Sequence, residues 1–265
     1  MKIEFLGTGA ADYPRDRSGD NGTPFYMRRY SSALVGDSLL IDPGPHIYDY
    51  EEKLGRPGMF RGVTDIILTH SHGDHYDPKN VIRLCEEAGR TVRFYADEHA
   101  FAKLGGAAVP NLETVPVKAA VPFEIPGYGI MPCRSNHDLF FTGEQTLNYI
   151  VTETQSGRSF FYGADSGWIV YDTWLLIKKA KPNAMIFEAT LGDKFPGDDR
   201  IFGHTSIPMI EIMMQTVRAQ HGTADDCRYY TTHMARTLHG THEETAAALA
   251  PIGAVPAYDG MIIEI

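Results

Sequence analysis

The residues from His70 to His75 form a dense group of potential metal ligands. This segment reads HSHGDH and supplies the imidazoles of His70, His72 and His75 and the carboxylate of Asp74. Imidazole nitrogens and carboxylate oxygens are typical zinc ligands, and Gly73 allows the bend that would turn them toward a metal. A single loop histidine would more often be a solvated residue, but four ligands in six residues favour a metal site. Metal-dependent hydrolysis is therefore the first functional hypothesis.

The elements on either side place these ligands on a loop. Residues 65–69 are mostly apolar or β-branched, which predicts a buried strand. After the ligands, Asp77 is a predicted N-cap and Pro78 the first residue of a helix that ends at Ala88, before Gly89. The ligands thus follow the carboxyl end of a strand, where open α/β proteins usually build their sites.

The pattern His-x-His-x-Asp-His after an apolar strand resembles the signature of the metallo-β-lactamase fold superfamily of metallohydrolases. The resemblance implies three further ligands in a set order, each just past a strand. These are a histidine, an aspartate and a final histidine, and His137, Asp165 and His233 follow candidate strands in that order. Asp165 also distinguishes the chain from β-lactamases of the same fold, which place a cysteine there. Its three cysteines lie outside the ligand positions: Cys85, Cys133 and Cys227.

The resemblance further implies a pair of divalent metal ions as cofactors. One ion would be bound by three histidines, His70, His72 and His137. The other would be bound by Asp74, His75 and His233, and Asp165 would bridge the two. Zinc is expected, and manganese or iron also suits these ligand types. Such a pair holds a water or hydroxide, which becomes a nucleophile near neutral pH.

Glu188 and His204 narrow the reaction class. The segments around them resemble paired motifs of the phosphodiesterase branch, which includes tRNA 3′-end-processing nucleases and cyclic phosphate phosphodiesterases of phosphonate breakdown. A histidine oriented by a carboxylate is suited to protonate the leaving alkoxide. The alternative is that His204 begins a helix and Glu188 only ends a strand. The expected catalytic residues are Asp74, His204 and Glu188.

The leading hypothesis is thus a dinuclear metal-dependent phosphodiesterase acting on a small or cyclic phosphodiester through a metal-bridging hydroxide. A lactone or thioester hydrolase on the same metal site is the alternative. A third hypothesis is a non-catalytic metal-binding accessory protein that keeps the site for ligand binding.

Charge and composition narrow the partners. A formal net charge of −10 argues against nucleic acid, because nonspecific nucleic-acid affinity comes from clustered Lys and Arg. A metal pair would still attract a small anionic substrate, which is the expected partner. The sequence holds no apolar stretch of membrane length, and an odd cysteine count without a pairing pattern favours the cytoplasm. The resemblance is compatible with a homodimer.

Other polar residues receive weaker assignments. Asp42 matches an aspartate that supports the metal ligands in family members. Arg236, His239 and His242 lie either over the metals, where one would bind a substrate phosphate, or in a surface loop before a helix capped by Thr241 and Glu244. Many of the phosphonate-type phosphodiesterases carry an N-terminal cysteine cluster that binds a structural zinc. The corresponding 12–29 loop lacks cysteine, so no third, structural zinc is expected there. Its four arginines are expected to be solvated: Arg15, Arg17, Arg28 and Arg29.

Short strands alternate with helices along the chain. The expected strands span 3–7, 32–35, 39–42, 65–69, 91–95, 147–152, 159–163, 184–189, 228–232 and 261–265, and the expected helices 78–88, 171–181, 207–220 and 242–250. This pattern suits two facing sheets with helices outside. The resemblance implies an α/β fold, a four-layer αββα sandwich of two mixed β-sheets, as one domain over residues 1–265. A doubly wound parallel sheet is the alternative, and the Asp259-Gly260 hairpin signal disfavours it.

Overall fold

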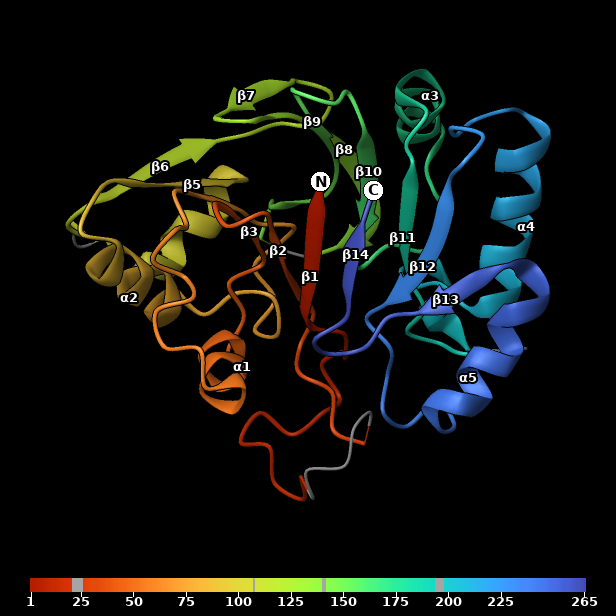
Figure 1. The fold of residues 1–265 in the computed structure, drawn as a ribbon, viewed down its shortest axis with the longest axis horizontal. Coiled ribbons are helices and arrows are strands. Elements are labelled where there is room, and N and C mark those ends of the chain that lie inside the picture. The colour runs from red at the N-terminus through yellow and green to blue at the C-terminus, as the bar shows by residue number, and fades with distance from the viewer. Residues whose placement is uncertain (21–25, 107, 140–141, 194–197) are drawn as a thin grey trace.

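A computed structural model describes residues 1–20, 26–106, 108–139, 142–193 and 198–265. Two seven-stranded sheets pack face to face, and helices cover the outer face of each (Figure 1). Both sheets contain parallel and antiparallel pairs. The predicted αββα sandwich of two mixed sheets is therefore confirmed, and the doubly wound parallel sheet is excluded.

The first sheet has the strand order β14-β1-β2-β3-β4-β5-β6. Its antiparallel half contains β14, β1 and β2, and the strands from β3 to β6 run parallel to one another. The strand bounds are β1 Lys2–Gly7, β2 Ser32–Val35, β3 Leu39–Ile41, β4 Asp65–Ile67, β5 Val92–Ala96, β6 Leu112–Pro116 and β14 Ile262–Glu264.

The second sheet has the order β13-β12-β11-β10-β9-β8-β7. The strands from β7 to β10 are antiparallel, and those from β10 to β13 are parallel. The bounds are β7 Phe123–Ile125, β8 Tyr128–Asp138, β9 Gln145–Glu153, β10 Ser159–Gly163, β11 Ala184–Glu188, β12 Arg228–Thr232 and β13 Ala254–Pro256.

Three buried apolar clusters hold the layers together. The first lies between the sheets and takes side chains from both, including Phe5 and Tyr149. The second packs α1 and α2 against the first sheet, and the third packs α3 and α4 against the second. Each large side chain buried in this way contributes about 1.5–3 kcal/mol. The helix bounds are α1 Ile47–Leu54, α2 Pro78–Ala88, α3 Tyr171–Ala180, α4 Ile207–Ala219 and α5 His242–Leu249, with 3₁₀ helices η1 Glu98–Leu104, η2 Asp199–Phe202 and η3 Ala250–Ile252.

Local signals located the ends of α2 correctly. The Asp77 side chain accepts a hydrogen bond from the Lys79 N–H, and Gly89 has the left-handed φ of 61° that ends the helix.

Among the described residues, no helix combines the length and apolar character needed to cross a membrane.

Several elements escaped prediction. The helix α1 has eight residues, β7 and β13 have three each, and no continuous apolar run like the one before the 70–75 loop marks them in the sequence. Most side chains of β6 face solvent, so it lacks the alternation of a half-buried strand. Its position depends on parallel pairing with β5.

The expectation that the arginines of the 12–29 loop are solvated is wrong for three of them, because the Arg17 side chain is also only 10% exposed. Arg28 and Arg29 are only 5% and 3% exposed. Arg29 forms an ion pair with Asp49 at 2.6 Å, and Arg28 donates to Thr8 and to the Ala257 carbonyl. These partners are distant in sequence, so no local sequence pattern predicts that the two arginines are buried.

Glu4 connects β1 to α1 through hydrogen bonds, and the free energy of unfolding should therefore fall at acid pH. Its carboxylate accepts hydrogen bonds from Tyr50 and Arg56, at 2.8 and 2.7 Å. Burial raises the pKa of Glu4, but these partners outweigh it, so the pKa lies below its usual value of 4.5. The stabilisation is complete above that value and is lost as the pH falls through the lower folded-state pKa.

We expect Glu4→Gln to reduce the free energy of unfolding by about 1–2 kcal/mol at pH 7 and by less near pH 3. Urea denaturation of both proteins at the two pH values measures this. Metal loss in acid affects both proteins alike, so the difference between them isolates Glu4. A difference that does not shrink in acid would contradict the assignment.

Candidate metal centre

Most of the predicted ligands, together with the supporting Asp42, lie where parallel strands end. Asp42 follows β3, Asp165 follows β10 and His233 follows β12, while the 70–75 loop comes soon after β4. Asp42, Asp165 and His233 have positive φ values of 57°, 44° and 53°. Non-glycine residues rarely adopt this conformation, which costs about 1–3 kcal/mol and concentrates at functional sites. The strand ends are therefore shaped to aim these side chains.

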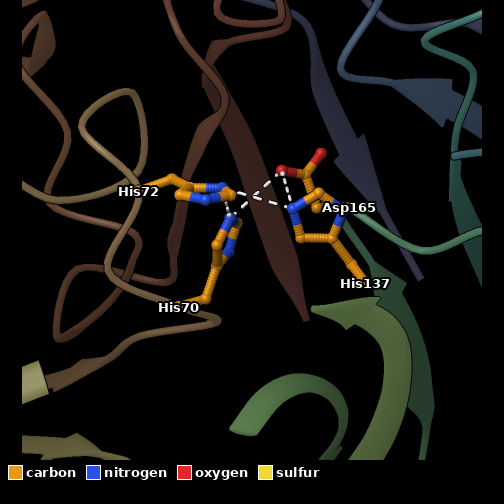
Figure 2. Close-up of side chains that lie close together, drawn as sticks. All are labelled: His70, His72, His137 and Asp165. Atoms are coloured by element: carbon orange, nitrogen blue, oxygen red, sulfur yellow. Dashed lines mark hydrogen bonds and ion pairs between the residues drawn. The ribbon is translucent and has the colours of Figure 1, made fainter. Parts of the chain in front are cut away.

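The first group contains His70, His72, His137 and Asp165, shown in Figure 2. The Nδ1 atom of His72 lies 2.9 Å from His70 Nε2 and 3.2 Å from His137 Nε2. Asp165 Oδ2 lies 3.1 Å from His70 Nε2. His137 was expected just past a strand, but it lies within β8, where the register shifts between Arg134 and Asp138. This irregularity interrupts the regular pairing of β8 at the ligand.

The second group contains Asp74, His75, Asp165 and His233, and all four are buried. The Nε2 atoms of His75 and His233 face one another at 3.1 Å. Asp74 Oδ2 lies 3.3 Å from His233 Nε2, and Asp165 Oδ2 lies 3.4 Å from His75 Nε2. Asp165 thus belongs to both groups.

Both groups have the chemistry of a cation site. Imidazole nitrogens point at one another within hydrogen-bonding distance, an arrangement that a cation between the lone pairs would stabilise. Asp165 Oδ1 is buried and lies 2.8 Å from His233 Nδ1, but no well-directed hydrogen bond reaches it from the described residues. Imidazole and carboxylate ligands of this kind fit zinc and other divalent first-row metals.

Charge in the centre favours a cation. Burial raises the pKa of Asp74 and Asp165, but neighbouring histidines outweigh it and hold both values well below the usual range. Burial likewise lowers the pKa of His233, yet Asp165 and Asp74 raise it to about 10. The carboxylates thus favour their ionised form and His233 its protonated form, so metal binding would release a proton.

Hydrogen bonds behind the ligands fix their orientation. Asp42 accepts from the Thr69 N–H and hydroxyl and lies 2.8 Å from His75 Nδ1, which leaves Nε2 of His75 facing the centre. His137 Nδ1 lies 3.1 Å from the Gly203 carbonyl, and His233 Nδ1 lies 2.8 Å from the Thr190 hydroxyl. Such contacts select the imidazole tautomer and raise ligand basicity.

Glu188 and His204 meet beside the second group. Glu188 Oε1 lies 3.2 Å from His204 Nδ1 and accepts from the Thr205 N–H, while Oε2 accepts from the Thr190 N–H. His204 Nδ1 is also 3.7 Å from Asp165 Oδ1. The carboxylate is buried, whereas the His204 side chain is 19% exposed. The ring therefore stands between the buried centre and solvent.

Sequence reasoning missed Glu144. Its buried carboxylate accepts from the Ser71 N–H at 2.6 Å and from the Ser71 hydroxyl at 2.5 Å, between His70 and His72. Lys103 donates to the Ser71 carbonyl. Glu144 is separated from Ser71 by 73 positions, so no local motif joins them.

Three polar residues after His233 were expected either over the metals or in a surface loop. His239 Nε2 contacts the Ala189 carbonyl, and His242 Nδ1 lies 3.1 Å from Arg28 Nη2. The capping box of Thr241 and Glu244 is confirmed. Arg236 stays exposed.

The fold has two mixed sheets, and two groups of histidine and aspartate side chains lie near the ends of their strands. These features define a candidate metallohydrolase. A family model described as "Beta-lactamase superfamily domain" matches residues 38–257. The chain belongs to this superfamily, and membership supports a metal-dependent hydrolase. No curated protein matches the chain in sequence.

Solved structures share the fold over its whole length. A diphosphatase from the PhnP family is 20% identical, with a TM-score of 0.72 over 100% of this chain and 97% of that one. The metallo-beta-lactamase fold protein YhfI from Bacillus subtilis is 16% identical, with a TM-score of 0.73 over 100% and 98%. The short form of human tRNase Z is 20% identical, with a TM-score of 0.69 over 100% and 99%. At these identities the likeness establishes the fold.

Proposed function

We propose that this protein is a dinuclear metal-dependent phosphodiesterase that acts on a small or cyclic phosphodiester. The observation that carries the proposal is the position of His204, with Nδ1 held at 3.2 Å by Glu188 and with Asp165, the residue common to both metal groups, 3.7 Å away. Phosphodiester hydrolysis needs charge neutralisation on the phosphoryl oxygens and a proton for the leaving alkoxide. In this proposal, His204 held by Glu188 would supply the proton, and cations held by the two ligand groups would neutralise the charge.

The ligand set divides into two groups that share Asp165. Zinc is the metal we propose for both. The chemistry that a bound metal pair supplies is charge neutralisation and a water of lowered pKa. His70, His72 and His137 would hold one ion, and Asp74, His75 and His233 the other. Asp74 would serve catalysis through this ligand role, because its Oδ2 lies 3.3 Å from His233 Nε2 and the two atoms can face the same ion.

His204 is the proton donor in this proposal. Because its Nδ1–H points to Glu188, Nε2 is the nitrogen free to face a leaving group. A buried carboxylate beside an imidazole also favours the protonated ring. Burial lowers the pKa of His204, but Glu188 and Asp165 reverse this effect and raise it above its usual value.

The fold neighbours add support of a weaker kind. One is a diphosphatase and another is tRNase Z by name. The net charge of −10 argues for a small anionic substrate over a nucleic acid, since nucleic-acid binding depends on basic surface.

The test is hydrolysis of bis(p-nitrophenyl) phosphate by protein reconstituted separately with zinc and with manganese. We expect turnover in the wild type and a loss of at least about 10²-fold in His70→Ala, because a ligand of the first group is removed. Cleavage of lactones or thioesters without phosphodiester cleavage would replace this proposal with the carboxyl-ester alternative. Full metal occupancy with no hydrolysis would instead favour an accessory protein.

A further inference from the structure

A cavity of about 400 Å³ lies between the loop after β1 and the segment that leads into α5. Tyr13 and Arg28 line one side, and Met234, Arg236 and His242 line the other. Its described lining contains none of the proposed metal ligands. Met234, which lines the cavity, directly follows the proposed ligand His233 in the chain.

Arg28 is a buried cation without a counter-charge in direct contact. Its guanidinium donates to Thr8 Oγ1 at 2.6 Å and to the Ala257 carbonyl at 2.8 Å, and it lies 3.1 Å from His242 Nδ1. Burial lowers the pKa of His242, and Arg28 lowers it further, so this imidazole is neutral near pH 7, as are the Thr8 hydroxyl and the Ala257 carbonyl. The Tyr13 side chain is a further hydrogen-bond partner of Arg28. Within the described ranges, Arg28 forms no ion pair with a carboxylate. A buried charge of this kind is costly unless an anion compensates it.

Asp259 does not fill that role, because other groups already engage it. Its Oδ1 accepts from the Thr8 hydroxyl at 2.8 Å, and its Oδ2 accepts from the Arg29 N–H at 2.7 Å. Arg29 also forms an ion pair with it at 3.6 Å. Asp259 is thus a nearby charge that raises the pKa of Arg28, but the described residues show no direct ion pair between the two, and the Thr8 hydroxyl stands between them.

Arg236 adds a second guanidinium to the lining. Its backbone N–H is held by Asp12 at 2.7 Å, which fixes the chain beside the cavity. Its exposed side chain makes no ion pair with the carboxylates of the described segments. Glu243 is the acidic residue of the lining, so the two arginines leave an excess of positive charge there. This excess stands out on a protein with a net charge of −10.

We propose that this cavity, which we name the Arg28 pocket, binds an oxyanion through the guanidinium groups of Arg28 and Arg236. Guanidinium forks match the oxygens of phosphate and carboxylate groups. The inference rests on the proposed function in one respect: the oxyanion is a second charged group of the same substrate whose phosphodiester lies at the metal centre. Along the chain, Met234 lies between His233 of the metal centre and Arg236 of the pocket.

Inorganic phosphate is the first probe, titrated calorimetrically into the metal-loaded protein. We expect two classes of phosphate site in the wild type, because the metals also bind phosphate. His70→Ala should weaken the class at the metals and keep the other. Arg236→Gln should weaken the retained class by about tenfold or more, the loss expected for one charge-assisted hydrogen bond.

Matched variants make the result decisive. Arg61→Gln removes an exposed guanidinium outside the cavity lining and should bind phosphate like the wild type. Arg28→Gln should act like Arg236→Gln. If Arg28→Gln fails to fold, the exposed Arg236 still decides the question. Phosphate binding by Arg236→Gln equal to that of Arg61→Gln would overturn the pocket.

A kinetic comparison tests whether the oxyanion belongs to the substrate. The probes are thymidine 5′-(p-nitrophenyl phosphate) with and without a 3′-phosphate. In Arg236→Gln we expect KM to rise about tenfold for the 3′-phosphorylated probe alone. Equal effects on both probes would overturn the substrate assignment. If the wild type cleaves neither probe, the proposed function fails, while the phosphate titration still decides the pocket.

Discussion

Replacing His204 by alanine is expected to lower hydrolysis of a phosphodiester with an alkyl leaving group by about 10²–10⁴-fold, the usual contribution of a general acid. Both metal groups should keep their ions, because His204 belongs to neither of the two proposed ligand sets. The ring lies against Glu188 through Nδ1 and is partly exposed, so its removal leaves no large buried cavity. The measurements are kcat on a 2′,3′-cyclic nucleotide and metal content by mass spectrometry.

The leaving group separates proton donation from a structural role. p-Nitrophenolate departs without a proton, so His204→Ala should lose much less activity on bis(p-nitrophenyl) phosphate than on the cyclic nucleotide. His99→Ala, which removes an exposed histidine bonded to Asp97, is the matched control and should retain activity on both. Equal losses on both substrates would show that His204 does not supply the proton.

Glu144→Ala should weaken metal binding although Glu144 is not one of the proposed ligands. Its carboxylate holds both the N–H and the hydroxyl of Ser71, the residue between His70 and His72. Without it these buried donors lose their acceptor, which costs about 1–3 kcal/mol of folding free energy. Loosened support around ligands typically lowers metal affinity by about 10–100-fold. Competition with a zinc chelator and urea denaturation measure the two effects.

A conservative variant and a control variant test whether the loss comes from the Glu144 carboxylate. Glu144→Gln keeps the shape and one acceptor oxygen, so it should restore most of the affinity and stability. Glu113→Ala removes an exposed carboxylate from β6 and should behave like the wild type. Wild-type metal affinity in Glu144→Ala would show that the 70–75 loop keeps its geometry without this support.

Much of the architecture was predictable because its signals are local. The β4 strand and the α2 helix have a short-range apolar pattern, an N-cap at Asp77 and a terminating glycine at Gly89. The ligand loop lies between them. The strands before Asp165 and His233 were predictable for the same reason, and both residues follow their strands as expected.

The same reasoning failed where long-range contacts decide the outcome. The strand β6 is held by its pairing with β5, and its own side chains are largely exposed. Arg28 looked like a solvated loop charge, but Ala257, 229 positions away, helps to bury it. His137 lies in an irregular part of β8 whose register depends on β9.

The sequence by itself determined the types of the candidate metal ligands, the order in which they occur and the strands and helices that carry most of them. These features follow from residue chemistry and from periodicity over a few residues. Tertiary structure alone decided that Glu144 supports Ser71 and that Arg28 faces a cavity with Arg236. The physical reason is that each of these relations joins residues far apart in sequence, and only the packing of the two sheets brings them within contact.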